Sequence, residues 1–194
     1  MSTYCNLINF PQIAKDMLTN DINVKNLDTS NKYGYGSEFI IPSKFPKEFN
    51  AWLADIAGLT VEISELFFLW PNQRHPIHID GSSYPIQKGK LNFIIGGKGS
   101  KMCWYEPKDV NKFRIRSISQ AEDGGYIHID GNNARELYSA ELVDFCIVDA
   151  GTFHTVQNSS ELRIAWNLVL ADCKTKERLL LPALQERLSE YVLD

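Results

Sequence analysis

The sequence predicts a mostly β domain, a sandwich or barrel, with flanking helices at both ends. Between residues 60 and 171, short apolar segments alternate with turns rich in Gly, Asn and Ser, a spacing typical of such folds. On either side of this region, the spacing of apolar residues or the composition favours helices. The chain has 194 residues, enough for one domain with a substantial core and too few for two ordinary ones. We therefore expect a single domain, with a helical and loop region over 1–59, a β core over 60–171 and a C-terminal helix over 172–194.

Two helices are expected before the β core. Residues 11–20 form a plausible short helix, because Pro11 stands at an early position where its missing N–H group costs little. Residues 46–57 have apolar side chains at the three- and four-residue spacing of an amphipathic helix, which Gly58 would end. The intervening segment, 21–44, is polar and rich in turn-forming residues.

The β core should begin with a strand over residues 60–70, which alternates at first and then becomes apolar throughout. Further strands are predicted over residues 90–95, 101–105, 112–118, 126–129, 142–148 and 162–170. The C-terminal segment 174–193 has the composition of a helix, with Pro182 in its first turn. Its apolar residues would pack on the β core or on a second subunit; they are Leu179, Leu180, Leu184, Leu188 and Val192.

Composition limits the cellular compartments and the classes of partner that we expect. The net charge is −4 and the basic residues are scattered, so nothing favours a nucleic-acid partner. The N-terminus lacks a signal-peptide pattern, and no apolar run approaches roughly 18–20 residues, so no membrane partner is expected. The four cysteines form no C-x-x-C pair, which argues against a zinc clamp; they are Cys5, Cys103, Cys146 and Cys173. We expect a cytoplasmic protein with reduced cysteines.

The segment His78-Ile79-Asp80 carries the chemistry that stands out most in this chain. In a strand, residues i and i+2 point to the same side, so the imidazole of His78 and the carboxylate of Asp80 would approach one point. A second imidazole would complete a set of two histidines and one carboxylate. That set leaves three positions open on one face of iron(II), enough for a bidentate cosubstrate and dioxygen. His154, in a turn that leads into a strand, is the natural third ligand, so we predict His78, Asp80 and His154 as metal ligands and catalytic residues.

Arg163 follows His154 by nine residues and opens the last apolar strand. A buried guanidinium requires an anion, since an unpaired buried charge costs several kcal/mol. The distal carboxylate of 2-oxoglutarate would provide that anion. The alternative is a structural salt bridge to Glu65, Asp144 or Glu161.

The order H-x-D, long spacer, His, Arg resembles the iron(II)- and 2-oxoglutarate-dependent oxygenases. Within that superfamily, HIDG…KLNFIIGG…MCWYEP followed by AGTFHTVQNSSELRIAWNL looks like a bacterial and phage branch akin to aspartyl/asparaginyl and prolyl hydroxylases. The resemblance covers roughly residues 66–170. It implies a double-stranded β-helix of the jelly-roll or cupin-like kind, and it implies Fe(II), 2-oxoglutarate as cosubstrate and O2.

The same resemblance assigns residues beyond the three ligands. Arg163 would bind the far carboxylate of the cosubstrate. Asn92 would face the cosubstrate or order its surroundings, and Trp104 and Tyr105 would line the pocket. The implied activity is hydroxylation of a peptidyl or free amino-acid side chain, or of another small molecule, with release of succinate and CO2.

Two further histidines, His128 and His75, lie outside the predicted ligand set. A second His-Ile-Asp-Gly begins at His128, 26 residues before His154, whereas the first copy lies 76 residues before it. Because several strands must fit between the two halves of the ligand set, the first copy is preferred. His128 and Asp130 are then expected to cap a turn or lie on the surface, although His128 could lie near the pocket. His75 precedes Pro76 and is expected in a loop.

Two other functions remain open at the level of sequence. A cupin-like metalloenzyme that does not use 2-oxoglutarate would share the barrel and the ligands but would not need Arg163. A non-catalytic β-sandwich module that binds a sugar or a protein would have unrelated histidines and no metal. The substrate depends on the expected lid regions, 21–45 and 106–140, whose sequences predict no particular ligand.

Overall fold

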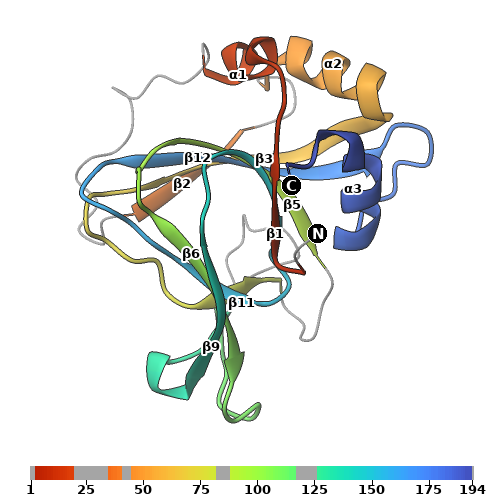
Figure 1. The fold of residues 1–194 in the computed structure, drawn as a ribbon. Coiled ribbons are helices and arrows are strands. Elements are labelled where there is room, and N and C mark those ends of the chain that lie inside the picture. Colours follow the sequence, from red (N-terminus) through yellow and green to blue (C-terminus); the bar gives the residue numbers. More distant parts are fainter. Residues whose placement is uncertain (1–2, 20–34, 41–44, 82–87, 117–125, 194) are drawn as a thin grey trace.

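The protein consists of two six-stranded antiparallel sheets that face each other, with helices covering the outer face of one of them (Figure 1). The computed structural model describes residues 3–19, 35–40, 45–81, 88–116 and 126–193. The mostly β architecture with flanking helices confirms the prediction from sequence. Within the described ranges, no helix is long and apolar enough to cross a membrane.

The first sheet has the strand order β1-β10-β5-β12-β3-β2, and the second has the order β7-β8-β4-β11-β6-β9. The strands of the first sheet are β1 (Cys5–Ile8), β10 (Asp144–Asp149), β5 (Gly89–Gly96), β12 (Arg163–Asp172), β3 (Leu59–Leu69) and β2 (Tyr35–Ile40). Those of the second are β7 (Arg114–Arg116), β8 (Tyr126–His128), β4 (His78–Asp80), β11 (Phe153–Gln157), β6 (Lys101–Pro107) and β9 (Ala134–Glu141).

The helices of the described ranges pack on the first sheet, and strand alternation explains why. Most alternate side chains of β3, β5, β10 and β12 are large apolar groups on the outer face; examples are Leu66, Phe93, Phe145 and Trp166. The helices cover this face with α1 (Gln12–Thr19), α2 (Lys47–Ala57) and α3 (Leu181–Arg187). Two 3-10 turns, Gly131–Asn133 and Ser189–Tyr191, complete the helical elements of the described ranges. The alternate side chains therefore point between the sheets.

The C-terminal helix is shorter than the sequence predicts. It begins at Leu181, with Pro182 in its first turn, because the preceding residues fold back and Arg178 bridges to Ala171. Leu184 and Leu188 are fully buried in the core beneath the helices, so this helix packs on the β core.

Several strands were not predicted. Strand β9 carries mostly exposed side chains and pairs with β6 alone, at the edge of the second sheet, so burial imposed no alternation on its sequence. Strand β1 is a second edge strand of only four residues, paired with β10. Short or exposed edge strands leave a weak periodic signal, which is why these segments were missed.

The space between the sheets has an apolar part and a polar part. An apolar cluster that includes Trp104, Met102, Cys146 and Ala165 fills the first part. The second part is a cavity of about 210 Å³, lined by side chains from both sheets. This polar cavity is where the sequence places its candidate metal ligands.

Candidate metal centre

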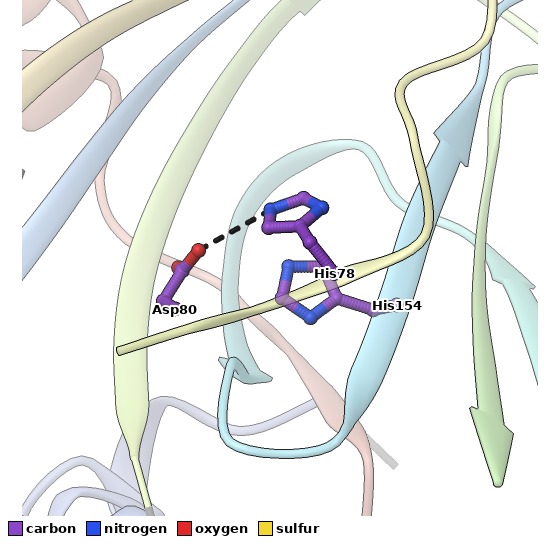
Figure 2. A group of neighbouring side chains, drawn as sticks. All are labelled: His78, Asp80 and His154. Carbon is purple, nitrogen blue, oxygen red and sulfur yellow. Dashed lines mark ion pairs between the residues drawn. The ribbon is translucent and has the colours of Figure 1, made fainter. Parts of the chain in front are cut away.

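Three side chains that could bind a metal ion meet on the inner face of the second sheet. His78 and Asp80 lie on β4, and His154 lies on β11, where it pairs directly with His78 across the antiparallel ladder. The ring centroids of the two histidines are 4.5 Å apart. One potential ligand atom from each of the three residues lies within 4.8 Å of the others, and all three residues are buried (Figure 2). The two-residue spacing thus places both side chains of β4 beside the third ligand.

The distances within this group fit a metal ion. His78 Nε2 lies 3.2 Å from Asp80 Oδ1. Nitrogen and oxygen ligands sit about 2.1 Å from a divalent transition metal, so two of them at right angles are separated by about 3 Å. The donor set of two imidazoles and one carboxylate is the set that suits non-haem iron(II). Both the chemistry and the spacing of these side chains therefore fit Fe(II).

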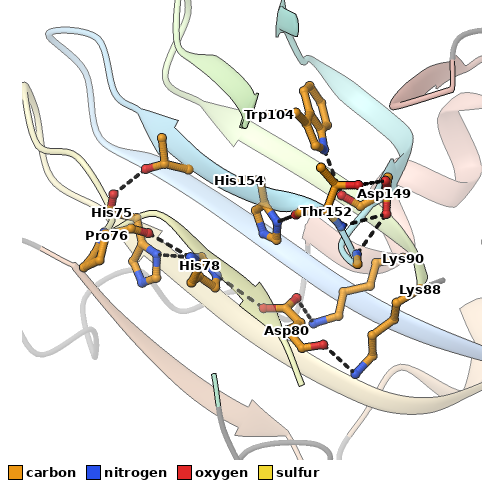
Figure 3. Close-up of polar contacts among 12 residues, drawn as sticks. His75, Pro76, His78, Asp80, Lys88, Lys90, Trp104, Asp149, Thr152 and His154 are labelled. Carbon is orange, nitrogen blue, oxygen red and sulfur yellow. Dashed lines mark hydrogen bonds and ion pairs between the residues drawn. The ribbon is translucent and has the colours of Figure 1, made fainter. Parts of the chain in front are cut away.

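Backbone carbonyls fix the orientation of both imidazoles. His78 Nδ1 lies 2.8 Å from the carbonyl oxygen of Pro76, and His154 Nδ1 lies 2.8 Å from that of Thr152 (Figure 3). Because a carbonyl only accepts, each Nδ1 carries the proton and donates it. Each Nε2 is then left with a free lone pair, which is the form that binds a metal.

A short turn positions Thr152 for this task. The carboxylate of Asp149 accepts hydrogen bonds from the backbone N–H of Gly151 at 2.9 Å and from the hydroxyl of Thr152 at 2.6 Å. The carbonyl of Asp149 accepts from the indole Nε1 of Trp104 at 2.8 Å. Trp104 therefore acts on the turn before His154 and is not among the residues that line the cavity.

The surroundings of Asp80 and His154 favour the protonation states that bind a cation. Burial opposes ionisation of Asp80, but the positive charge of Lys90, which reaches across from the first sheet to Asp80 Oδ2 at 2.8 Å, outweighs it and holds the pKa of Asp80 well below its usual value. Burial, with the positive charge of a protonated His78 as a second cause, lowers the pKa of His154 to about 4. At neutral pH, Asp80 is thus an anion and His154 a neutral donor.

This lowered pKa predicts a pH-dependent stability of the metal-free protein. Between about pH 6.5 and pH 4, the unfolded chain binds a proton on His154 that the folded chain does not, so the free energy of unfolding falls as the pH falls through this window. A shift of this size corresponds to about 3 kcal/mol. Thermal unfolding of metal-free protein across this range should show the loss, and His154→Gln should flatten the dependence. An equal slope in both proteins would contradict the prediction.

Arg163 faces the same cavity from the first residue of β12 and is only 3% exposed. Among the described residues, its guanidinium has no hydrogen-bond acceptor and no ion-pair partner. Of the predicted structural partners, Asp144 pairs with Lys15, and Glu161 accepts a hydrogen bond from the backbone of Lys98. Burial lowers the pKa of Arg163 to about 10, so it remains a cation at neutral pH.

The stem of Arg163 packs against a glycine. Gly97 has a φ of +62°, and a Cβ atom built there would lie 2.6 Å from Cβ of Arg163 and 2.8 Å from its Cγ. Any side chain at position 97 would therefore displace the arginine, besides straining the backbone.

The remaining predicted residues divide into two groups. Asn92 on β5 lines the cavity, and its Oδ1 is buried without a hydrogen-bond partner in the described structure. Tyr105 differs from the prediction, because it alternates with Trp104 on β6 and lies on the outer face of the second sheet, in an apolar cluster with Phe153. Its hydroxyl accepts a hydrogen bond from Arg74 there, at 3.0 Å. Neither Trp104 nor Tyr105 lines the cavity, which corrects the prediction for both.

The second His-Ile-Asp-Gly copy lies beside the first. Strand β8 pairs with β4 so that His128 is opposite His78, and His128 lines the cavity, with its ring centroid 5.9 Å from that of His78. Asp130 caps the following 3-10 turn, where its carboxylate accepts from the backbone N–H of Asn132 at 2.8 Å, as expected.

His75 and Lys90 also line the cavity and were missed from the sequence. The ring of His75 lies 4.4 Å from that of His78, centroid to centroid. Since His75 precedes a proline in a loop, nothing local in the sequence indicated its position. Lys90 could have been found, because it stands two residues before Asn92 on the same strand and so shares its face.

Comparison with known proteins gives similarity in structure only. No family model matches the chain, and no curated protein matches it. Similar solved structures include a prolyl hydroxylase from Trichoplax adhaerens in complex with a peptide fragment, with a TM-score of 0.47, 11% identity, and coverage of 88% of this chain and 84% of that one. A prolyl-4-hydroxylase from Pseudomonas putida has a TM-score of 0.45, 13% identity, and coverage of 85% and 91%.

An oxalate oxidase in complex with the substrate analogue glycolate is also similar, with a TM-score of 0.36 and 11% identity. This match covers 80% of the present chain, which spans about 59% of the length of that oxidase.

Proposed function

We propose that this protein is an iron(II)- and 2-oxoglutarate-dependent oxygenase that hydroxylates a small molecule or a peptide side chain. The observation that carries the proposal is the buried Arg163, a cation without an acceptor among the described residues, in the same cavity as the candidate ligands. A buried charge of this kind needs an anionic partner. A dicarboxylate that binds the metal at one end would provide one at the other.

The polar residues at the centre of this proposal would then have distinct tasks. His78, Asp80 and His154 would hold iron(II) and leave one face of it open to cosubstrate and dioxygen. Arg163 would bind the distal carboxylate of 2-oxoglutarate as a charge-assisted pair. Lys90 keeps Asp80 ionised, and the unpaired Asn92 Oδ1 offers an acceptor to a bound ligand. When bound, iron and 2-oxoglutarate would supply the oxidising chemistry: one oxygen atom of dioxygen would go to the succinate formed with release of CO2, and the other to a C–H bond of the substrate.

The test is an anaerobic titration of metal-free protein with iron(II) and then with 2-oxoglutarate. A visible metal-to-ligand charge-transfer band should appear when both are present, because the 2-oxo acid chelates the metal. Succinate in place of 2-oxoglutarate is the control, since it has no keto group and should give no band. Iron binding without the band would instead indicate a metalloenzyme that does not use 2-oxoglutarate, and no specific metal binding would rule out both.

A further inference from the structure

A polar row crosses the inner wall of the first sheet, apart from Arg163. Asn92 on β5 pairs with Asn167 on β12, and Asn167 pairs in turn with Glu65 on β3. All three residues line the cavity. Asn167 lies four residues from Arg163 on the same strand, which corresponds to roughly 13 Å along the strand axis. The row is therefore a separate part of the wall from the position proposed for the distal carboxylate.

Glu65 is a carboxylate in need of a partner. It is only 6% exposed, and among the described residues it has neither an ion pair nor a hydrogen bond to its side chain. Neither of the two cations that line the same cavity, Lys90 and Arg163, forms an ion pair with Glu65. Lys90 is bonded to Asp80 at 2.8 Å, and Arg163 begins its strand four residues beyond the row. A buried carboxylate without compensation is unfavourable, so its presence in this cavity points to a cationic ligand.

A second, independent acceptor lies in the same row. Asn92 Oδ1 is buried and has no hydrogen-bond partner in the described part of the chain. Two unsatisfied acceptors on one wall call for a ligand that brings hydrogen-bond donors, and the negative charge of Glu65 calls for a cation. Glu65 also lines a small side pocket together with Tyr126 and the Asp80–Lys90 ion pair, so a group bound to Glu65 would lie beside a candidate metal ligand.

We propose that Glu65 binds a cationic nitrogen of the substrate, an ammonium or a guanidinium group, with Asn92 accepting a further hydrogen bond from it. This inference rests on the proposed oxygenase function and names the class of its substrate. The substrate is a basic amino acid, free or within a peptide, and the carboxylate places its cationic end on the wall opposite the metal ligands.

The first test needs neither iron nor 2-oxoglutarate. Because Glu65 is buried without a partner, Glu65→Gln should raise the Tm of the metal-free protein by roughly 2–4 °C. The matched control is Glu62→Gln on the same strand, an exposed residue that pairs with Arg178, where Tm should stay or fall. A lower Tm for Glu65→Gln than for the control would mean that Glu65 has a structural partner, which would overturn the inference.

The second test uses the anaerobic iron(II)–2-oxoglutarate complex and follows its charge-transfer band. L-arginine, L-lysine and short peptides containing them are added, and the neutral counterparts are citrulline and norleucine, free or in the same peptides, which differ in having an uncharged side chain. A cationic ligand should shift the band at concentrations where its neutral counterpart does not, and Glu65→Gln should weaken this binding by at least about 30-fold. The free amino acids and the peptides distinguish the two sources of the cation.

The outcomes separate this inference from the function on which it rests. Absence of the band before any amino acid is added would count against the oxygenase itself, and the Tm comparison would still test the uncompensated charge of Glu65. A band that forms normally but responds to none of the cationic ligands, or equally to their neutral counterparts, would overturn the inference alone.

Discussion

Replacing Arg163 with methionine should weaken 2-oxoglutarate binding by about 100- to 1000-fold while iron(II) still binds. The guanidinium is buried and has no acceptor among the described residues, so the cosubstrate would supply its ion pair. Removing one partner of a buried ion pair costs about 3–5 kcal/mol, and each factor of ten corresponds to about 1.4 kcal/mol. The measurement is a titration of the charge-transfer band with 2-oxoglutarate under anaerobic conditions.

The control for this variant is Arg135→Met, because Arg135 is an exposed arginine that pairs with Glu106 on the outer edge of the second sheet. Its affinity for 2-oxoglutarate should equal that of the wild type. Without ligands, Arg163→Met should be at least as stable as the wild type, since it removes an uncompensated buried cation. Unchanged affinity for 2-oxoglutarate in Arg163→Met would exclude this arginine as the carboxylate anchor.

The second large effect is expected at the metal. His154→Ala should reduce the affinity for iron(II) by more than about 100-fold, because it removes one of the three proposed ligands. Losses of up to about 100-fold follow even when only a hydrogen-bond partner of a ligand is removed. Competition with a coloured chelator measures the affinity directly. With this ligand gone, the charge-transfer band should be absent at iron concentrations that saturate the wild type.

His128→Ala is the matched control, since His128 lies in the same cavity and pairs with His78 but is outside the group of ligand atoms that lie within 4.8 Å. It should retain both iron binding and the band. Equal losses in His128→Ala and His154→Ala would mean that the second His-Ile-Asp-Gly copy takes part in metal binding, and the proposed ligand set would be wrong.

The local parts of the site could be predicted from sequence, and the long-range parts could not. The convergence of His78 and Asp80 follows from strand periodicity alone. Arg163 could be singled out because a charge in an apolar strand requires a reason. By contrast, the contact of His75 with His78 depends on a loop whose path is set by hydrogen bonds to β11, including one from Thr155 to the carbonyl of His75.

Periodicity also shows which prediction could have been avoided. Trp104 and Tyr105 are consecutive in β6, so only one of them can point between the sheets. Trp104 does, and its indole supports the turn before His154, whereas Tyr105 lies outside. The two His-Ile-Asp-Gly copies lie side by side because β4 and β8 pair antiparallel. No pattern in the sequence between the two strands predicts that pairing.

The close approach of Gly97 to the stem of Arg163 gives this site a two-position signature. A side chain at position 97 and an arginine at 163 in its present conformation exclude each other sterically, although 66 residues separate the two positions in the chain. Among distant relatives, glycine at the first position should therefore accompany arginine at the second, and relatives that have lost the arginine are free to lose the glycine. Searching for this coupled pair together with H-x-D would recover proteins with this site at identities too low for ordinary alignment.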